Sequence, residues 1–237
     1  MLTDSRLVPL PQPRPAPARW HPGLESGVRH VEVLASDDEA GGAAFALAQA
    51  GMGQGEDQRP WLWVQDKAAV RRTGRPCRAG LPAHLRHRLI HVAADSAADA
   101  LFALEEGVRC RDLAFVLGEI AGNPAALDFT ASRRLSLAAE RHGVPLWLVR
   151  PGARRDASSA RMRWQVSAAP GAPARWNAQG PGDPRWRAEL FRAHRYQPGE
   201  WMIQWDDHAR ISVVAPDHGA VVSGTGDRPL AAERISA

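Results

Sequence analysis

Cysteine and long apolar runs are scarce in this 237-residue chain, and each scarcity excludes a class of protein. Cys77 and Cys110 are the only cysteines, too few for a disulfide-stapled secreted domain, so we expect a reducing compartment. No stretch approaches the ~18 uncharged apolar residues of a membrane span. The first residues carry prolines and arginines where a secretory signal needs an apolar run. These absences predict a cytoplasmic protein that does not enter a membrane.

Lysine is almost missing as well, because Lys67 is the only one among 30 lysine and arginine residues. Any reaction that requires a lysine must therefore use Lys67 or be absent. The formal net charge is only +4. This charge permits contact with nucleic acid without demanding it, because nonspecific DNA binding depends on a dense local cluster of cations. GC-rich coding also produces such an excess of arginine.

The two ends of the chain differ in composition from the segment between them. Five prolines between Pro9 and Pro17 are incompatible with a helix or a central strand. The last residues lack hydrophobic periodicity and carry Gly and Asp. We therefore expect a disordered proline-rich arm at 1–19, one folded domain at 20–213 and a flexible tail at 214–237.

Short apolar runs alternate with helical segments in the first part of the predicted domain. Strands that are apolar on both faces are typical of parallel sheets covered by helices. The predicted strands are 31–35, 61–65, 89–92, 113–117 and 144–149. Helices are predicted at 97–108, with Ser96 as N-cap, and at 131–142, with Gly143 as left-handed C-cap.

From about residue 160 onward, apolar and polar residues alternate. The segments 161–167, 185–190 and 201–205 show this pattern, which predicts antiparallel strands with one solvated face. Most of the nine tryptophans lie on predicted strands, so we expect them in the core. The predicted fold class is α/β: a mostly parallel sheet flanked by helices and extended by an antiparallel C-terminal meander.

The first strand–helix junction, VEVLASDDEAGGAAFAL at 31–47, is where an α/β protein binds phosphate. Such a loop needs glycine-rich backbone amides, a lysine for the terminal phosphates and a Ser or Thr for magnesium. The glycines are present, but Gly or Ala stands where Lys and Ser/Thr are expected, and three acidic residues at 37–39 oppose phosphate. The residues of this degenerate phosphate loop are Gly41, Gly42, Ala43 and Ala44. We expect no nucleotide cofactor and no catalytic residue here.

Glu119 and a group of histidines are two further candidates for chemistry. Glu119 ends the fourth predicted strand, where a carboxylate can hold magnesium or activate water, but without a nearby lysine we favour a solvated glutamate. His84, His87 and His91, with Cys77 nearby, have the spacing of a metal cluster but lack a CxxC or HExxH pattern. We therefore expect no metal.

Arginines gather where the chain leaves the last predicted parallel strand. They are Arg150, Arg154, Arg155, Arg161 and Arg163. Loops at the carboxyl ends of parallel strands are where such sheets bind ligands. The four arginines beyond the strand can contact the phosphates of single-stranded DNA, or they can form a solvated loop. The sequence leaves both interpretations open.

Several segments also carry a family resemblance. They are GLESGVRHVEVLASDDEAGGAAFALA from Gly23 and LIHVAADSAADALFALEEGVRCRDLAFVLGEI, and then the more specific LDFTASRRLSLAAERHGVPLWLVRPG, SSARMRWQVSAAPG and WRAELFRAHRYQPGEWMIQWDD. The first two resemble a RecA-type core with a degenerate phosphate loop. The last three resemble the ImuA family of RecA-like proteins, and the resemblance spans about residues 20–213.

The resemblance implies a non-catalytic accessory role in DNA-damage-induced mutagenesis within the SOS response. The partners it implies are an ImuB-like homologue of Y-family polymerases, an error-prone replicative-type polymerase and RecA. It places the loop 151–160, here shortened, where RecA-type proteins contact DNA, and Gly118 where a magnesium carboxylate is expected. The alternatives are a divergent DNA-stimulated ATPase that uses Glu119 and an arginine, and a SulA-type inhibitor of cell division.

Overall fold

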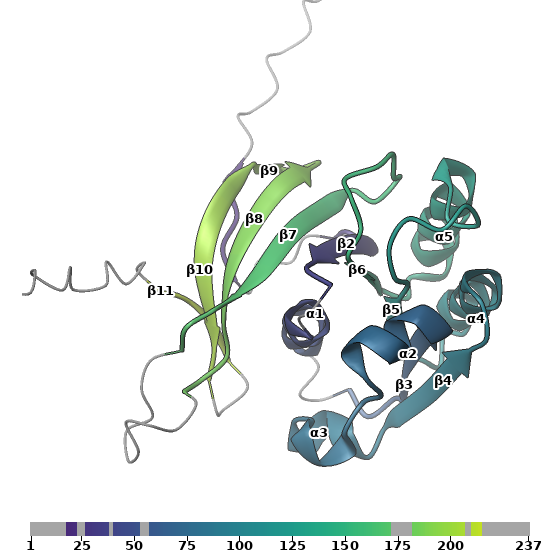
Figure 1. Ribbon diagram of the computed structural model, residues 1–237, viewed down its shortest axis with the longest axis horizontal. Coiled ribbons are helices and arrows are strands. Elements are labelled where there is room, and N and C mark those ends of the chain that lie inside the picture. Colours follow the sequence, from purple (N-terminus) through teal and green to yellow (C-terminus); the bar gives the residue numbers. More distant parts are fainter. Residues whose placement is uncertain are drawn as a thin grey trace, which may run out of the picture.

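A computed structural model describes the chain over residues 18–22, 27–37, 40–52, 57–171, 182–206 and 210–214. Figure 1 shows a curved antiparallel meander beside a helix-covered core. The predicted disorder of 1–17 and 215–237 lies outside the described residues. Among the described residues, no helix is both long and apolar enough to cross a membrane.

One sheet of nine strands joins the two parts, in the order β11-β10-β8-β7-β2-β6-β5-β3-β4 among the described residues. Its parallel strands are β2 (His30–Ala35), β3 (Trp61–Asp66), β4 (Leu89–Ala94), β5 (Val116–Glu119), β6 (Leu146–Pro151) and β7 (Met162–Ala169). The antiparallel meander adds β8 (Arg185–Ala193), β10 (Gly199–Trp205) and β11 (Ile211–Val214). The predicted mixed α/β fold class is therefore confirmed.

Strand β7 corrects one detail of the prediction. Alternation over 161–167 predicted an antiparallel strand, but β7 pairs in parallel with β2, with Val31 opposite Met162, and antiparallel with β8. Alternation shows that one face of a strand is solvated, which is common in antiparallel sheets but does not fix the direction of each neighbouring strand. β7 is thus the strand at which the parallel core turns into the meander.

Helices cover both faces of the parallel strands. On one face, α1 (Gly41–Gly51) buries Phe45 among tryptophans of the sheet. On the other face, α4 (Ala97–Arg109) and α5 (Phe129–His142) cover the opposite sides of the same strands. Three short helices lie between β3 and β4: α2 (Lys67–Thr73), the 3-10 helix η1 (Arg78–Gly80) and α3 (Ala83–Arg86).

The predicted caps and tryptophan positions are largely confirmed. The Ser96 hydroxyl accepts a hydrogen bond from the Asp99 amide (3.1 Å), and Gly143 ends α5 with a φ of 75°. Most of the tryptophans on the strands are buried, namely Trp61, Trp63, Trp164, Trp186 and Trp201. Ile90 is instead 46% exposed, because β4 is an edge strand and not a strand covered on both sides.

Two residues assigned to the proline-rich arm belong with the folded part. Ala18 and Arg19 form β1, which pairs in parallel with β9 (Tyr196–Gln197). Trp20 follows and is buried, with its ring edge-on to Trp164 at a centroid distance of 4.8 Å. This contact, together with the edge-on packing of Trp20 on Trp201 of β10, attaches the start of the described chain to β7 and the meander.

Candidate functional site

The strand–helix junction that the sequence singled out is closely packed. A Cβ added to Gly42 would lie 2.6 Å from Cβ of Ala35 and 3.1 Å from Cγ1 of Val149. Gly42 therefore lets the first turn of α1 contact the ends of β2 and β6. Lys67 is exposed at the start of α2, and no hydrogen bond or ion pair between described residues links it to this junction.

An ion pair lies over the carboxyl ends of β2 and β6. The Arg72 guanidinium of α2 pairs with Asp37, just beyond β2, and also donates to the Pro151 carbonyl oxygen (3.3 Å). Gly152 lies beneath this pair with a φ of 67°, and a Cβ there would collide with the Asp37 carboxylate. The pair lies where a phosphate would approach, and its guanidinium is already bound by the Asp37 carboxylate.

Glu119 is buried, so the expectation of a solvated strand-end glutamate is wrong. Its side chain lies at the end of β5 and is only 1% exposed. Nε2 of Gln65 donates to its Oε2 at 2.5 Å, and the Thr73 hydroxyl donates to the same oxygen at 3.1 Å. These partners come from β3 and α2, far away in the sequence, and so no local signal announces them.

The surroundings of Glu119 make it a titratable group near neutral pH. Burial raises the pKa of the Glu119 carboxyl to about 7, although the hydrogen bonds from Gln65 and Thr73 act in the opposite direction. Nε2 of His91 lies 2.9 Å from Oε1 of Gln65, which extends the chain of contacts to β4. A buried carboxyl of this kind can accept or hold a proton, which is a property of functional sites.

The histidine segment does not assemble into a metal-binding group among the described residues, and Gly118 is packed against a helix. Among the described residues, no three His, Cys, Asp or Glu side chains form a group able to hold a metal. His91 faces Gln65, while Cys77 is exposed. A Cβ on Gly118 would lie 2.8 Å from Cδ1 of Leu104, so this position faces the packed underside of α4.

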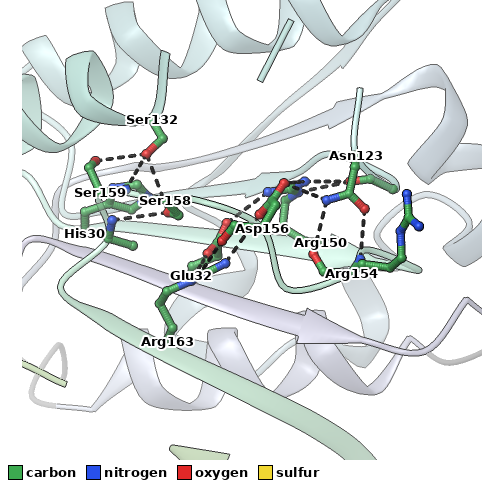
Figure 2. Close-up of polar contacts among 12 residues, drawn as sticks. His30, Glu32, Asn123, Ser132, Arg150, Arg154, Asp156, Ser158, Ser159 and Arg163 are labelled. Atoms are coloured by element: carbon green, nitrogen blue, oxygen red, sulfur yellow. Dashed lines mark hydrogen bonds and ion pairs between the residues drawn. The ribbon is translucent and has the colours of Figure 1, made fainter. Parts of the chain in front are cut away.

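Two of the arginines near the last parallel strands lie inside the molecule. Glu32 of β2 binds both of them (Figure 2). Nη1 of Arg150 lies 2.9 Å from Oε1 of Glu32, and Nε of Arg163 pairs with Oε2 of the same carboxylate. All three side chains are buried. The expected contact of Arg163 with DNA is therefore withdrawn, because its guanidinium is already bound within the fold.

A second carboxylate completes this internal network. Asp156, from the loop between β6 and β7, lies 3.3 Å from Nη2 of Arg150 and 3.4 Å from Nη2 of Arg163. Asn123 donates to the Asp156 carboxylate (2.6 Å) and accepts from the Arg154 amide (2.8 Å). Two guanidiniums and two carboxylates thus hold the loop onto the sheet (Figure 2).

Serine hydroxyls hold the end of the same loop against α5. The Ser159 amide donates to Oγ of Ser132 (2.6 Å), and the hydroxyls of Ser159 and Ser136 are 2.6 Å apart. Nδ1 of His30 lies 2.7 Å from Oγ of Ser136, and burial, followed by the charge of Arg163, lowers the pKa of His30 to about 3. This cluster was not predicted from the sequence, although Ser132 and Ser136 on the apolar side of a helix were a signal of it.

The remaining arginines of the predicted DNA-contacting set lie on the surface. Arg155 pairs with Glu189 and covers the Phe191 ring at 4.1 Å from its centroid. Nε of Arg161 lies 2.6 Å from Oε1 of Glu140. Within the described ranges, Arg154 is the member of the set whose guanidinium has no partner. The structure thus divides the five arginines into two internal and three external ones.

Comparison with known proteins decides the family. No family model matches the chain. It is 31% identical over 223 residues to Protein ImuA of Caulobacter vibrioides strain NA1000 / CB15N, with 89% of this chain and 86% of that protein covered. Protein ImuA of strain ATCC 19089 / CIP 103742 / CB 15 matches to the same extent. The chain belongs to the ImuA family. The match to ImuA covers almost nine-tenths of the chain.

Proposed function

We propose that this ImuA-family protein is a non-catalytic RecA-like accessory factor in DNA-damage-induced translesion synthesis. It acts through contacts with an ImuB-like homologue of Y-family polymerases in the cytoplasm, and an error-prone replicative-type polymerase and RecA are further partners. The observation that carries the proposal is the junction at β2 and α1. There Gly42 packs against Ala35, and the Asp37–Arg72 pair lies over the strand ends.

The chemistry of this junction supports a role without ATP hydrolysis. Transfer of a phosphoryl group depends on cations that neutralise the charge that develops on the phosphates, usually a lysine and magnesium. The loop supplies neither the lysine nor the Ser/Thr ligand of magnesium, and the Arg72 guanidinium over the strand ends is paired with Asp37. A RecA-type scaffold without these phosphate-binding groups is suited to binding partner proteins.

Contact with single-stranded DNA is a further element of the proposal. Arg154, Arg155 and Arg161 are exposed around the loop between β6 and β7. Two of them are held by carboxylates in exposed ion pairs, which contribute little and are easily exchanged for phosphate contacts. Three cations support weak binding that fades as salt concentration rises.

A divergent DNA-stimulated ATPase is the second candidate, and Glu119 is the observation that favours it. The carboxyl is buried, has a pKa of about 7 and is hydrogen-bonded to Gln65 and Thr73. A general base works best when its pKa is close to the operating pH. No contact among the described residues favours the SulA-type hypothesis.

Nucleotide binding and turnover separate these functions. The purified full chain is incubated with Mg-ATP, with and without single-stranded DNA, beside its Glu119→Gln variant. We expect no turnover above the buffer blank for either protein. DNA-stimulated hydrolysis that disappears in Glu119→Gln would contradict the accessory role and establish the ATPase.

A further inference from the structure

A groove beside α5 has no role in the internal networks described above. It holds about 330 Å³ and is lined by Phe129, Arg133 and Leu137 on one side and by Arg161, Arg192 and His194 on the other. We call these six residues the α5 groove. Its two walls come from a helix and from the strands and loop that the serine cluster holds against that helix.

Apolar side chains are exposed along the helical wall of the α5 groove. Phe129 is 48% exposed and Leu137 is 51% exposed, although the opposite face of α5 is buried against the sheet. Together with Arg133 they are spaced four residues apart, which aligns them along one side of the helix. Such a stripe matches the spacing with which one amphipathic helix packs on another.

The charge of the α5 groove is positive. Three guanidiniums line it, and Glu140 is the one carboxylate beside them. Glu140 is bound by Arg161, and Nη1 of Arg192 donates to the Ser158 carbonyl oxygen (2.9 Å). Among the described residues, Arg133 has no partner. An occupant with carboxylates therefore complements the groove better than a neutral or basic one.

Hydrogen bonds hold the walls of the α5 groove in place without any ligand. Ser159, which also lines the groove, is bound through its amide and its hydroxyl to Ser132 of α5. Its hydroxyl also meets that of Ser136, which contacts buried His30. A preformed groove binds more tightly than one that must be ordered first.

We propose that the α5 groove binds a short acidic amphipathic segment of a protein partner. The segment lies along α5 with apolar side chains between Phe129 and Leu137 and with carboxylates toward Arg133 and Arg192. The proposal rests on the proposed function, in which the ImuB-like polymerase homologue is the protein that carries the segment. Single-stranded DNA fits less well, because the exposed apolar side chain of Leu137 offers nothing to a phosphate and the Glu140 carboxylate beside the groove repels one.

A binding titration tests this assignment. The probe is the purified full-length ImuB-like polymerase homologue of the same organism, added to the full chain and to its Leu137→Glu and Arg133→Glu variants. Phe102→Glu is the matched control, because Phe102 is 68% exposed on α4 and is not among the residues that line the groove. All three sites are exposed, so thermal unfolding should show the same stability for each variant.

We expect at least tenfold weaker binding for both groove variants and unchanged binding for Phe102→Glu. Equal binding by all three variants would overturn the groove while leaving the polymerase as partner. No binding by the wild-type chain would overturn both. If the groove variants lose binding to oligo-dT and keep polymerase binding, the groove binds nucleic acid. If the wild-type chain forms concentration-dependent dimers that Leu137→Glu abolishes, the groove binds a second copy. Either result overturns the proposal.

Discussion

Glu32 and Arg150 form an ion pair inside the sheet, with Nη1 of Arg150 2.9 Å from Oε1 of Glu32 and side-chain exposures of 1% and 2%. The other oxygen of Glu32 binds Arg163, so one carboxylate holds two guanidiniums from the strands on either side. Asp156 supplies the second negative charge. The arginine-rich region is therefore partly a structural element that fixes the β6–β7 loop.

Glu32→Gln should destabilise the protein strongly. It leaves two buried guanidiniums with one partly exposed carboxylate, and breaking a buried pair typically costs about 3–5 kcal/mol. Urea unfolding at pH 7 measures the loss. Glu140→Gln is the control, because it breaks the exposed Arg161 pair and should cost less than about 1 kcal/mol. Equal losses in the two variants would show that the internal network contributes no more than a surface contact.

Glu119 should make stability fall as pH rises from about 4.5 to about 7. The pKa of this carboxyl is about 7 in the fold against 4.5 for an unperturbed glutamate, so the folded state favours the protonated carboxyl. The contribution is fully present below pH 4.5 and is lost as pH rises to about 7. Glu119→Gln should remove this dependence, and above pH 7 it should exceed wild type by on the order of 3 kcal/mol. Parallel pH slopes of unfolding free energy in the two proteins would contradict the burial of a protonated Glu119.

His30 should have the opposite pH dependence in acid. The pKa of this imidazole is about 3 in the fold against 6.5 for an unperturbed histidine, so stability falls as pH drops from 6.5 toward 3. The expected slope is about 1.4 kcal/mol for each pH unit. We expect His30→Asn to flatten that slope when both proteins carry Glu119→Gln, which removes the competing titration. An unchanged slope would mean that His30 is protonated in the folded protein.

Local patterns predicted what depends on neighbours in the sequence. The apolar strand runs, the Ser96 cap and the left-handed Gly143 are of this kind, because period and cap chemistry are written in adjacent residues. Arg150 and Glu32 are 118 positions apart, and so their pairing appears only when β2 and β6 lie side by side.

Which polar side chains are buried could not be predicted from the sequence either. Glu119 ends a strand in a manner typical of a solvated residue, and its partner Gln65 is 54 positions away. Phe129 and Leu137 have the helical spacing of a core stripe, and only the packing of α5 shows that they face outward. The degenerate phosphate loop needed no tertiary information, because the missing lysine is a fact of composition.

Gly42→Ala should destabilise the junction of β2 and α1. The added methyl would lie 2.6 Å from Cβ of Ala35, which has no rotamer by which to move away. The helix must shift, and overpacking of this kind typically costs about 1–3 kcal/mol. Gly80→Ala is the control, because a Cβ there has nothing within 4 Å. Thermal unfolding compares the variants, and equal midpoints would show that α1 does not need the close approach.

Recovery of partners from DNA-damaged cells tests the accessory role most directly. The tagged full chain is purified from damaged and undamaged cells of its source organism, and bound proteins are identified by mass spectrometry. The proposed role predicts a Y-family polymerase homologue, with or without RecA, in the damaged sample and its absence from a tag-only control. Recovery of a division GTPase, or of bound nucleotide, with no polymerase homologue would contradict it.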